Sequence, residues 1–310
     1  MDIQNELVWS HSRGRALHGC RRAYWFNYYG SWGGWDASAP KEARQAYVQK
    51  KLTSRAMWTG TVVHGIAEQG LKRAMEEADR RLPISDWPVE AMRALARRGA
   101  EADIEGSRSG RWLNRPSRLT GFAEHYYEVP VTDAEWQAAL DEIDRQVGNL
   151  VENRIYKRLR VAAARIREVE ELRRFSVGDA EVYLAVDALV GDGTGGVVII
   201  DWKTGENHDD AEIGAQLGVY GLYATQELGV PEDRIVAMHV NLRHDTETRH
   251  PVGAAEIEAA RSTIATSTAS MRERLADVAG NLALPEAHPP LPVGDPACAT
   301  CTFRGICGRR

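Results

Sequence analysis

A carboxylate and an ammonium group follow one strongly apolar stretch of the chain, a pattern that suits chemistry on a bound cation. Residues 197–200 (VVII) are all β-branched and predict a strand that is buried on both faces. Asp201, Trp202 and Lys203 follow directly, so Asp201 and Lys203 point to the same side of the extended chain. An ion pair that caps a core strand is the simpler interpretation, but buried charges also occur where a metal uses them.

A second aspartate is expected beside the first. Residues 185–190 (AVDALV) alternate as a strand with Asp187 at its centre, and residues 192–196 (DGTGG) predict a tight turn. A hairpin of this kind brings Asp187 and Asp201 side by side. Two carboxylates beside a lysine suit a hard divalent cation, with Lys203 free to orient a water or to stabilise negative charge on a phosphate.

Two predicted helices carry further polar residues that share a helix face. Residues 57–79 predict a long helix, in which His64 lies on the same face as an acid four positions later. Residues 211–228 predict another helix, which presents Gln216 and Tyr220 one turn apart. Taken alone, the histidine is explained by a hydrogen bond along its helix or in the core, and the other two residues by packing.

Together, these motifs resemble the RecB-like branch of the PD-(D/E)XK nuclease superfamily. In that branch a G-x-x-x-H helix, a lone Asp, D-x-K-T-G and Q-x-x-x-Y follow one another along the chain. The matching residues here are Gly60 to His64, Asp187, Asp201 to Gly205, and Gln216 to Tyr220. One departure is Ala185, which stands where these proteins usually carry Gly two residues before the first aspartate.

The resemblance assigns a role to each matching residue. It implies that His64, Asp187 and Asp201 hold Mg²⁺ or Mn²⁺, and that Lys203 assists the attacking water. Imidazole suits Mn²⁺ better than Mg²⁺. The resemblance also implies that Gln216 and Tyr220 position catalytic groups or DNA.

The resemblance further implies an α/β fold with a restriction-endonuclease-like core, in which helices flank a central mixed sheet within one nuclease domain over residues 1–310. Residues 82–164 are predicted to be mostly helical, and we interpret them as an insertion between the His64 helix and the first core strand. The predicted strands and helices of the remaining chain are strands over 169–177, 180–190, 197–202 and 234–242, and helices over 10–29, 41–52 and 254–278.

The four cysteines could together act as ligands of one metal centre. Cys20 lies within the predicted first helix, and Cys298, Cys301 and Cys307 lie close together near residue 300. The absence of an export signal argues against disulfides, whereas zinc and iron-sulfur clusters both accept four thiolates. The pattern resembles the iron-sulfur subgroup of these nucleases, which includes AddB-type nuclease domains and CRISPR-associated adaptation nucleases. That resemblance implies a 4Fe-4S cluster, with zinc as the alternative, held by segments 1–30 and 285–310.

Charge and composition restrict how such a protein would meet DNA. The chain has 310 residues, of which 43% are hydrophobic and 27% charged, and a net charge of -5. It has no apolar run of membrane-spanning length and no apolar leader, so we expect a cytoplasmic protein. The negative charge means that DNA must contact a local basic patch. The candidate phosphate contacts are Arg154, Lys157, Arg158 and Arg160, and Trp112 is a candidate to stack on a base, although such runs are often solvated surface.

These features favour a metal-dependent DNA nuclease. We expect an exonuclease that acts on single-stranded DNA ends, in DNA repair, recombination or CRISPR adaptation. A non-catalytic DNA-binding or scaffolding protein that keeps the fold and the cluster is the alternative. The chain keeps His64, Asp187, Asp201 and Lys203. This argues against the alternative, because a protein without catalytic activity would not need to retain these residues.

Overall fold

The central sheet contains the strand that the sequence predicts before Asp201. The structure is a computed structural model that describes residues 4–206 and 210–308. Five strands form a mixed sheet, in which β7 runs parallel to β8 and the other neighbours are antiparallel. In spatial order they are β3 (Ile166–Glu168), β6 (Ala188–Gly191), β7 (Val197–Lys203), β8 (Ile235–Asn241) and β9 (Thr246–His250). The predicted mixed sheet flanked by helices is therefore confirmed.

A separate hairpin stands beside this sheet. It consists of β4 (Glu171–Val177) and β5 (Ala180–Val186). The prediction of one strand over residues 180–190 is wrong, because the chain bends at Asp187 and changes partner from β4 to β7. The bend is stabilised by the Asp187 carboxylate, which accepts a hydrogen bond from the Trp202 amide at 2.7 Å.

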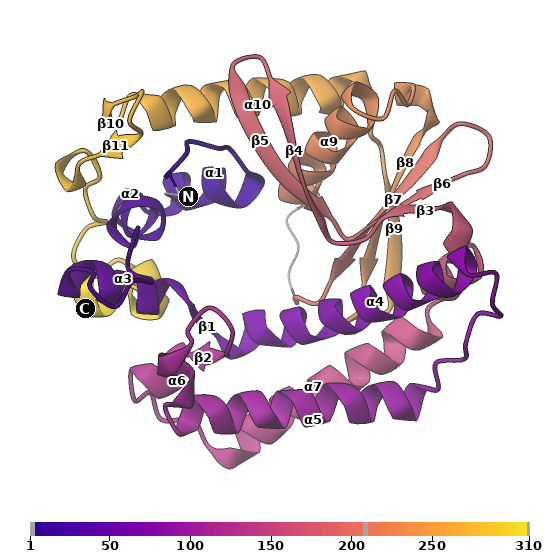
Figure 1. The fold of residues 1–310 in the computed structure, drawn as a ribbon, viewed down its shortest axis with the longest axis horizontal. Coiled ribbons are helices and arrows are strands. Elements are labelled where there is room, and N and C mark those ends of the chain that lie inside the picture. The colour runs from indigo at the N-terminus through magenta and orange to yellow at the C-terminus, as the bar shows by residue number, and fades with distance from the viewer. Residues whose placement is uncertain (1–3, 207–209, 309–310) are drawn as a thin grey trace.

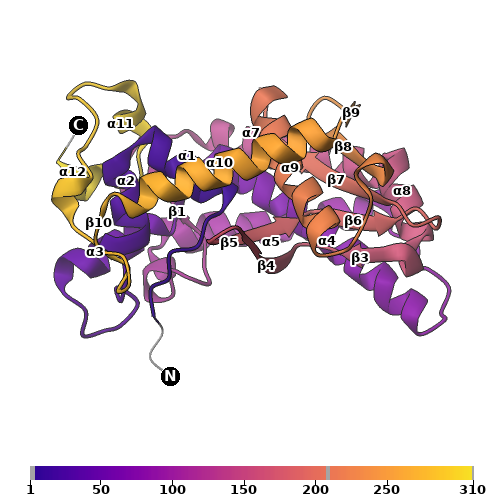
Figure 2. The same cartoon turned by 90° about the horizontal axis from the view of Figure 1, so that it is seen from above.

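Two helical layers cover the central sheet (Figures 1 and 2). On one face, Val197 and Ile199 of β7 pack in a core shared with α9 (Asp210–Gln226) and α10 (Ala254–Arg272). On the other face, Ile200 and Trp202 pack in a core shared with α4, α5, α7 and α8. The four helices are α4 (Arg55–Asp79), α5 (Val89–Arg108), α7 (Asp133–Glu152) and α8 (Arg154–Val161). Strand β7 is therefore buried on both faces, as predicted.

Residues 82–164 lie mainly in α5, α7 and α8, which pack against α4. The short α6 (Ala123–Tyr126) and the 3₁₀ turn η2 (Arg111–Asn114) also belong to this region. A two-residue parallel pair joins β1 (Leu52–Thr53) to β2 (Gly121–Phe122). Helix α7 begins in a capping box formed by Thr132 and Glu135.

The segments that carry the cysteines meet at one end of the molecule (Figures 1 and 2). The chain forms α1 (His11–Gly19), α2 (Arg21–Trp25), the π-helical turn η1 (Phe26–Gly30) and α3 (Lys41–Lys50) there. The predicted continuous helix over 10–29 is wrong, because Cys20 is extended and its sulfur accepts a hydrogen bond from the Ala23 amide at the start of α2.

The last part of the chain returns to these N-terminal helices. Its elements are β10 (Leu275–Asp277), β11 (Leu282–Ala283), the 3₁₀ turn η5 (Pro285–Ala287), α11 (Pro296–Thr300) and α12 (Arg304–Cys307). Two further 3₁₀ turns, η3 (Ala163–Arg165) and η4 (Glu232–Arg234), lie earlier in the chain. Phe26 and Phe303 stack with ring centroids 5.5 Å apart, which joins the two ends. No helix in the described ranges has the length and apolar character needed to cross a bilayer.

Candidate active site

Three potential metal ligands converge from three separate segments. His64 lies in the middle of α4, Glu170 precedes β4, and Asp187 occupies the bend between β5 and β6. His64 Nδ1 is 3.2 Å from Glu170 Oε1 and 3.7 Å from Asp187 Oδ2. One ligand atom from each residue lies within 4.8 Å of the other two. An imidazole and two carboxylates at this spacing form a donor set suited to Mg²⁺ or Mn²⁺.

Asp201 adds a third acidic group, whose hydrogen bonding is incomplete. Its side chain is 1% exposed, and Oδ1 accepts a hydrogen bond from Lys203 Nζ at 3.0 Å. Oδ2 is buried and has no hydrogen-bond partner among the described residues. A buried carboxylate oxygen without a partner is costly, so this atom fits a cation ligand.

The titration of the site reflects the crowding of its acids. Burial raises the pKa of Asp187, and the neighbouring Asp201 and Glu170 raise it further, whereas His64 opposes them. Burial would lower the pKa of His64, but Asp187 and Glu170 outweigh it and raise the pKa to about 9. A cation in this position would relieve the repulsion between the carboxylates and would favour neutral imidazole.

A chain of hydrogen bonds fixes the position of Lys203. Its Nζ donates to Gln216 Oε1 at 3.0 Å, and Gln216 Nε2 donates to Tyr220 Oη at 2.7 Å. Tyr220 Oη donates in turn to the carbonyl of Ala185 at 3.0 Å. Burial raises the pKa of Tyr220 well above its usual value, so the phenol remains a donor. Gln216 and Tyr220 thus connect the Lys203 ammonium group to the backbone of β5.

Gly60 explains why the histidine helix lies so close to the end of β7. A Cβ placed on Gly60 would lie 2.7 Å from Oγ1 of Thr204, the residue after Lys203. The absence of a side chain therefore lets α4 approach this loop and bring His64, one turn later, to the acids.

The structure groups His64 and Asp187 with Glu170, which the sequence argument missed. Asp201 lies close enough for its charge to act on both His64 and Asp187, and it binds Lys203. Glu170 lies between two strands at φ 51°, a backbone conformation that is uncommon outside glycine. The turn between β3 and β4 places Glu170 in the site, and no local sequence motif predicts that turn. The side chains of His64, Glu170 and Lys203 are 28%, 26% and 26% exposed, so the site is open to a cation and a substrate.

The predicted DNA contacts have mixed surroundings. Arg154, Lys157 and Arg158 are exposed on α8, although Arg154 pairs with Glu247 and Lys157 with Glu152. Arg160 lies over the ring of Trp87 and donates to the carbonyl of Ser85. The suggestion that Trp112 stacks on a base is wrong for this structure, because Trp112 is 2% exposed and packs in a core with Val48, Leu52 and Ala123.

The four cysteines line one small cavity. Cys20 of the first segment faces Cys298, Cys301 and Cys307, and the remaining lining is mostly apolar and includes Phe26 and Phe303. In the described part of the chain, no three of the sulfur atoms lie within 4.8 Å of one another. Burial raises the pKa of the Cys301 thiol, and the other three cysteines contribute to the shift.

A mixed sheet flanked by helices, with a histidine and acids at its edge that could hold a cation, fits the restriction-endonuclease-like class of fold. The chain matches the PD-(D/E)XK nuclease superfamily over residues 8–308 and belongs to it. A comparison with curated proteins gives no match. The solved crystal structure of SSO0001 is similar at 16% identity, covering 79% of this chain and 96% of that one, with a TM-score of 0.30. That likeness is too low to carry an argument.

Proposed function

We propose that this protein is a RecB-like, metal-dependent DNA nuclease that degrades single-stranded DNA from its ends. The main support for the proposal is the convergence of His64, Glu170 and Asp187 beside Asp201 Oδ2. The three residues offer ligand atoms suited to a divalent cation, and the buried Asp201 oxygen lacks a hydrogen-bond partner among the described residues, a partner whose place a cation could take. Repair, recombination or CRISPR adaptation in the cytoplasm is the setting we propose for it.

The residues around the site support hydrolysis of a phosphodiester. When bound, Mg²⁺ or Mn²⁺ would supply charge neutralisation at the phosphate and an acidified water. Lys203 donates to Asp201 and Gln216, which leaves the third hydrogen of its ammonium group for a water or a phosphate oxygen. The bond to Gln216 holds the ammonium group in one direction, so charge stabilisation needs little rearrangement.

Digestion of end-labelled DNA tests the proposal. Linear single strands should be degraded with Mn²⁺ or Mg²⁺, circular single strands of the same composition should survive, and EDTA should stop the reaction. Degradation of the circular strands at the same rate would show that the protein is an endonuclease and not an exonuclease. Failure to degrade any DNA with either metal would favour the non-catalytic, scaffolding alternative.

The exposed face of α8 is the proposed path for the DNA backbone. Lys157 and Arg158 follow Arg154 by about one helical turn, and all three are exposed, whereas Tyr156 and Leu159 of the same helix are buried. Replacing both Arg154 and Arg158 with Ala should flatten the salt dependence of single-strand binding, by about 0.7 in log–log slope for each phosphate that the protein no longer neutralises.

The matched control for this face is Arg98→Ala, which removes an exposed arginine from α5. An unchanged salt slope in the double variant would show that α8 is merely a solvated surface.

We further propose that Cys20, Cys298, Cys301 and Cys307 hold a 4Fe-4S cluster. Four thiols around a cavity with a mostly apolar lining provide the required ligands. In a tetrahedral zinc site with Zn–S bonds of about 2.3 Å, the sulfur atoms lie about 3.8 Å from one another. No three of these four sulfur atoms all lie within 4.8 Å of one another, so their spacing is wider than a zinc site requires. Protein purified without oxygen should be brown and contain about four iron atoms per chain, and stoichiometric zinc in a colourless preparation would replace this proposal.

A further inference from the structure

A cavity of about 510 Å³ lies beside Lys203, between α1, β5 and α9. His11, Arg15 and Lys203 line it together with the hydroxyls of Ser10 and Ser12. Among the described residues, neither Asp nor Glu lines this cavity, although the whole chain has a net charge of -5. This local charge favours an anionic ligand.

The polar end of the cavity is held in place before any ligand arrives. The Trp9 amide donates to the carbonyl of Glu181 at 2.7 Å, and the Tyr183 amide donates to the carbonyl of Trp9 at 2.8 Å. These bonds attach the chain before α1 to β5. Ser10 then caps α1 by accepting a hydrogen bond from the Arg13 amide at 3.1 Å. A preorganised polar end reduces the entropy lost on binding.

Apolar and aromatic side chains make up another part of the lining. Leu172 of β4 lines it and is 69% exposed, which is unusual for a large apolar side chain. Tyr183 also lines it, and Arg174 lies over the Tyr183 ring at 5.7 Å from its centroid. Leu172 pairs across the hairpin with Ala185, which lines the same cavity. A cationic end and an apolar or aromatic wall are the two parts of a nucleotide site.

His11 and Arg15 line the polar end of the cavity, where His11 lacks a hydrogen-bond partner at one ring nitrogen and Arg15 has an exposed, exchangeable partner. His11 Nε2 is buried and has no hydrogen-bond partner among the described residues, since Glu212 is 3.9 Å away. Burial and the nearby Arg15 lower the pKa of His11, so the positive charge comes from Arg15 and Lys203. Arg15 pairs with Glu212 in an exposed contact, which contributes little and can be exchanged for a phosphate.

We propose that this cavity binds the single nucleotide next to the scissile phosphate, with the nucleotide's own phosphate at Arg15 and its base against Leu172 and Tyr183. This inference rests on the proposed nuclease function. Lys203 borders the cavity and also donates to Asp201, so a nucleotide here adjoins the carboxylate site. The volume suits one nucleotide rather than a duplex, which favours action at the end of a strand.

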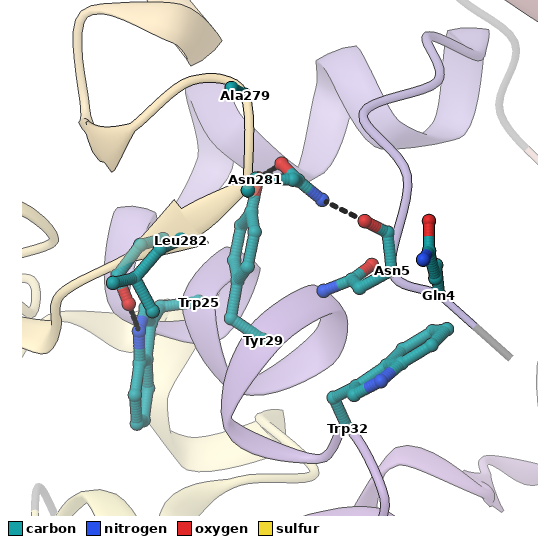
Figure 3. Close-up of a pocket in the computed structure, with 10 residues that line it drawn as sticks. Gln4, Asn5, Trp25, Tyr29, Trp32, Ala279, Asn281 and Leu282 are labelled. Carbon is teal, nitrogen blue, oxygen red and sulfur yellow. Dashed lines mark hydrogen bonds between the residues drawn. The ribbon is translucent and has the colours of Figure 1, made fainter. Parts of the chain in front are cut away.

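Another cavity of similar size, about 570 Å³, serves as a control (Figure 3). Trp25, Tyr29 and Trp32 line it, but among the described residues no Lys or Arg does. Tyr29 Oη donates to Asn281 Oδ1 at 3.2 Å, and Asn281 Nδ2 donates to the carbonyl of Asn5 at 3.0 Å. Its polar groups are thus paired with one another, and it lacks a cation for a phosphate.

Calorimetric titration of the full-length protein with deoxyadenosine 5′-monophosphate, without added divalent cation, tests the proposal. Arg15→Ala should weaken binding at least about tenfold, because a hydrogen bond to a charged group is removed. Glu212→Gln should tighten binding about two- to fivefold, because Arg15 loses its competing partner. Arg98→Ala on α5 and Trp32→Ala in the control cavity should leave the affinity unchanged.

The outcomes separate this site from the catalytic proposal. Unchanged affinity in Arg15→Ala, or loss of binding in Trp32→Ala, would overturn it, as would equal affinity for inorganic phosphate or for deoxyadenosine. DNA degradation without any nucleotide binding would overturn this proposal alone. Nucleotide binding by a protein that degrades no DNA would keep the site and reject the nuclease function.

Discussion

The carboxylate site and the cysteine cavity are two candidate metal centres that the fold constructs in different ways. The carboxylate site takes its groups from the sheet and the helices that cover it, and hydrogen bonds hold Lys203 and Asp187 in place. The cysteine cavity takes its thiols from short segments at the two ends of the chain. From this difference we expect substitutions in the carboxylate site to affect activity, and substitutions in the cysteine cavity to affect mainly stability.

Asp201→Asn should produce the largest loss of activity. It removes the negative charge from a buried carboxylate that we propose as a metal ligand, so the DNA cleavage rate should fall at least about a thousandfold. The iron content should not change, because the cysteines lie in a separate cavity. Rates within tenfold of wild type at saturating Mn²⁺ would remove Asp201 from the metal site.

Lys203→Ala should reduce the cleavage rate at least about a hundredfold, the scale for deletion of one positioned electrostatic or proton-transfer group. Unlike Asp201→Asn, this variant should still bind DNA and metal, because Lys203 is a hydrogen-bond donor and not a metal ligand. Single-turnover kinetics with a separate measurement of Mn²⁺ affinity would distinguish the two. A variant that cuts as fast as wild type would contradict the catalytic assignment.

Tyr220→Phe should have a smaller effect, about tenfold on kcat with little change in KM. The change removes the hydroxyl that connects Gln216 to the Ala185 carbonyl, which loosens Lys203 without removing it. Tyr223→Phe is the matched control, because Tyr223 lies on the same helix but donates to Glu168 instead. Equal losses in both variants would indicate general damage to α9 and would reject the positioning role.

Cys20→Ser should change the cleavage rate least, by less than about twofold at 20 °C, but it should lower Tm by roughly 10 °C or more. The expected loss of stability follows because the binding energy of an inorganic centre is also folding energy. Wild-type protein stripped of its metal is the reference and should melt like the variant. If the variant kept its Tm but lost activity, the cysteine cavity would be needed for catalysis and not for stability, which would contradict this prediction.

The catalytic strand was predictable because its signal is local. Four β-branched residues followed by D-W-K-T-G specify a buried strand with charges at its end, and β7 has this form. The four-residue spacing of Gln216 and Tyr220 likewise predicted a shared helix face, which the structure shows. The resemblance to a known nuclease family supplied the link between these pieces and His64, which no local pattern contains.

The missed features depend on tertiary structure. Cys20 interrupts an otherwise helical pattern because its thiol turns towards cysteines about 280 residues away. Glu170 joins the site through a turn between two strands, and Trp112 is covered by residues from other segments. In each case the decisive contact is distant in sequence, so periodicity and motif spacing carry no information about it.

The cysteine cavity also sets an order of events during synthesis. Cys20 leaves the ribosome first, but about 280 further residues must follow before Cys298, Cys301 and Cys307 can face it. At synthesis rates of about 5–20 residues per second, this interval lasts roughly 15–60 s. The carboxylate site can assemble within this interval, because its groups lie between residues 64 and 220. A four-thiolate centre would thus form after the carboxylate site, and only in chains that have been synthesised at least as far as Cys307.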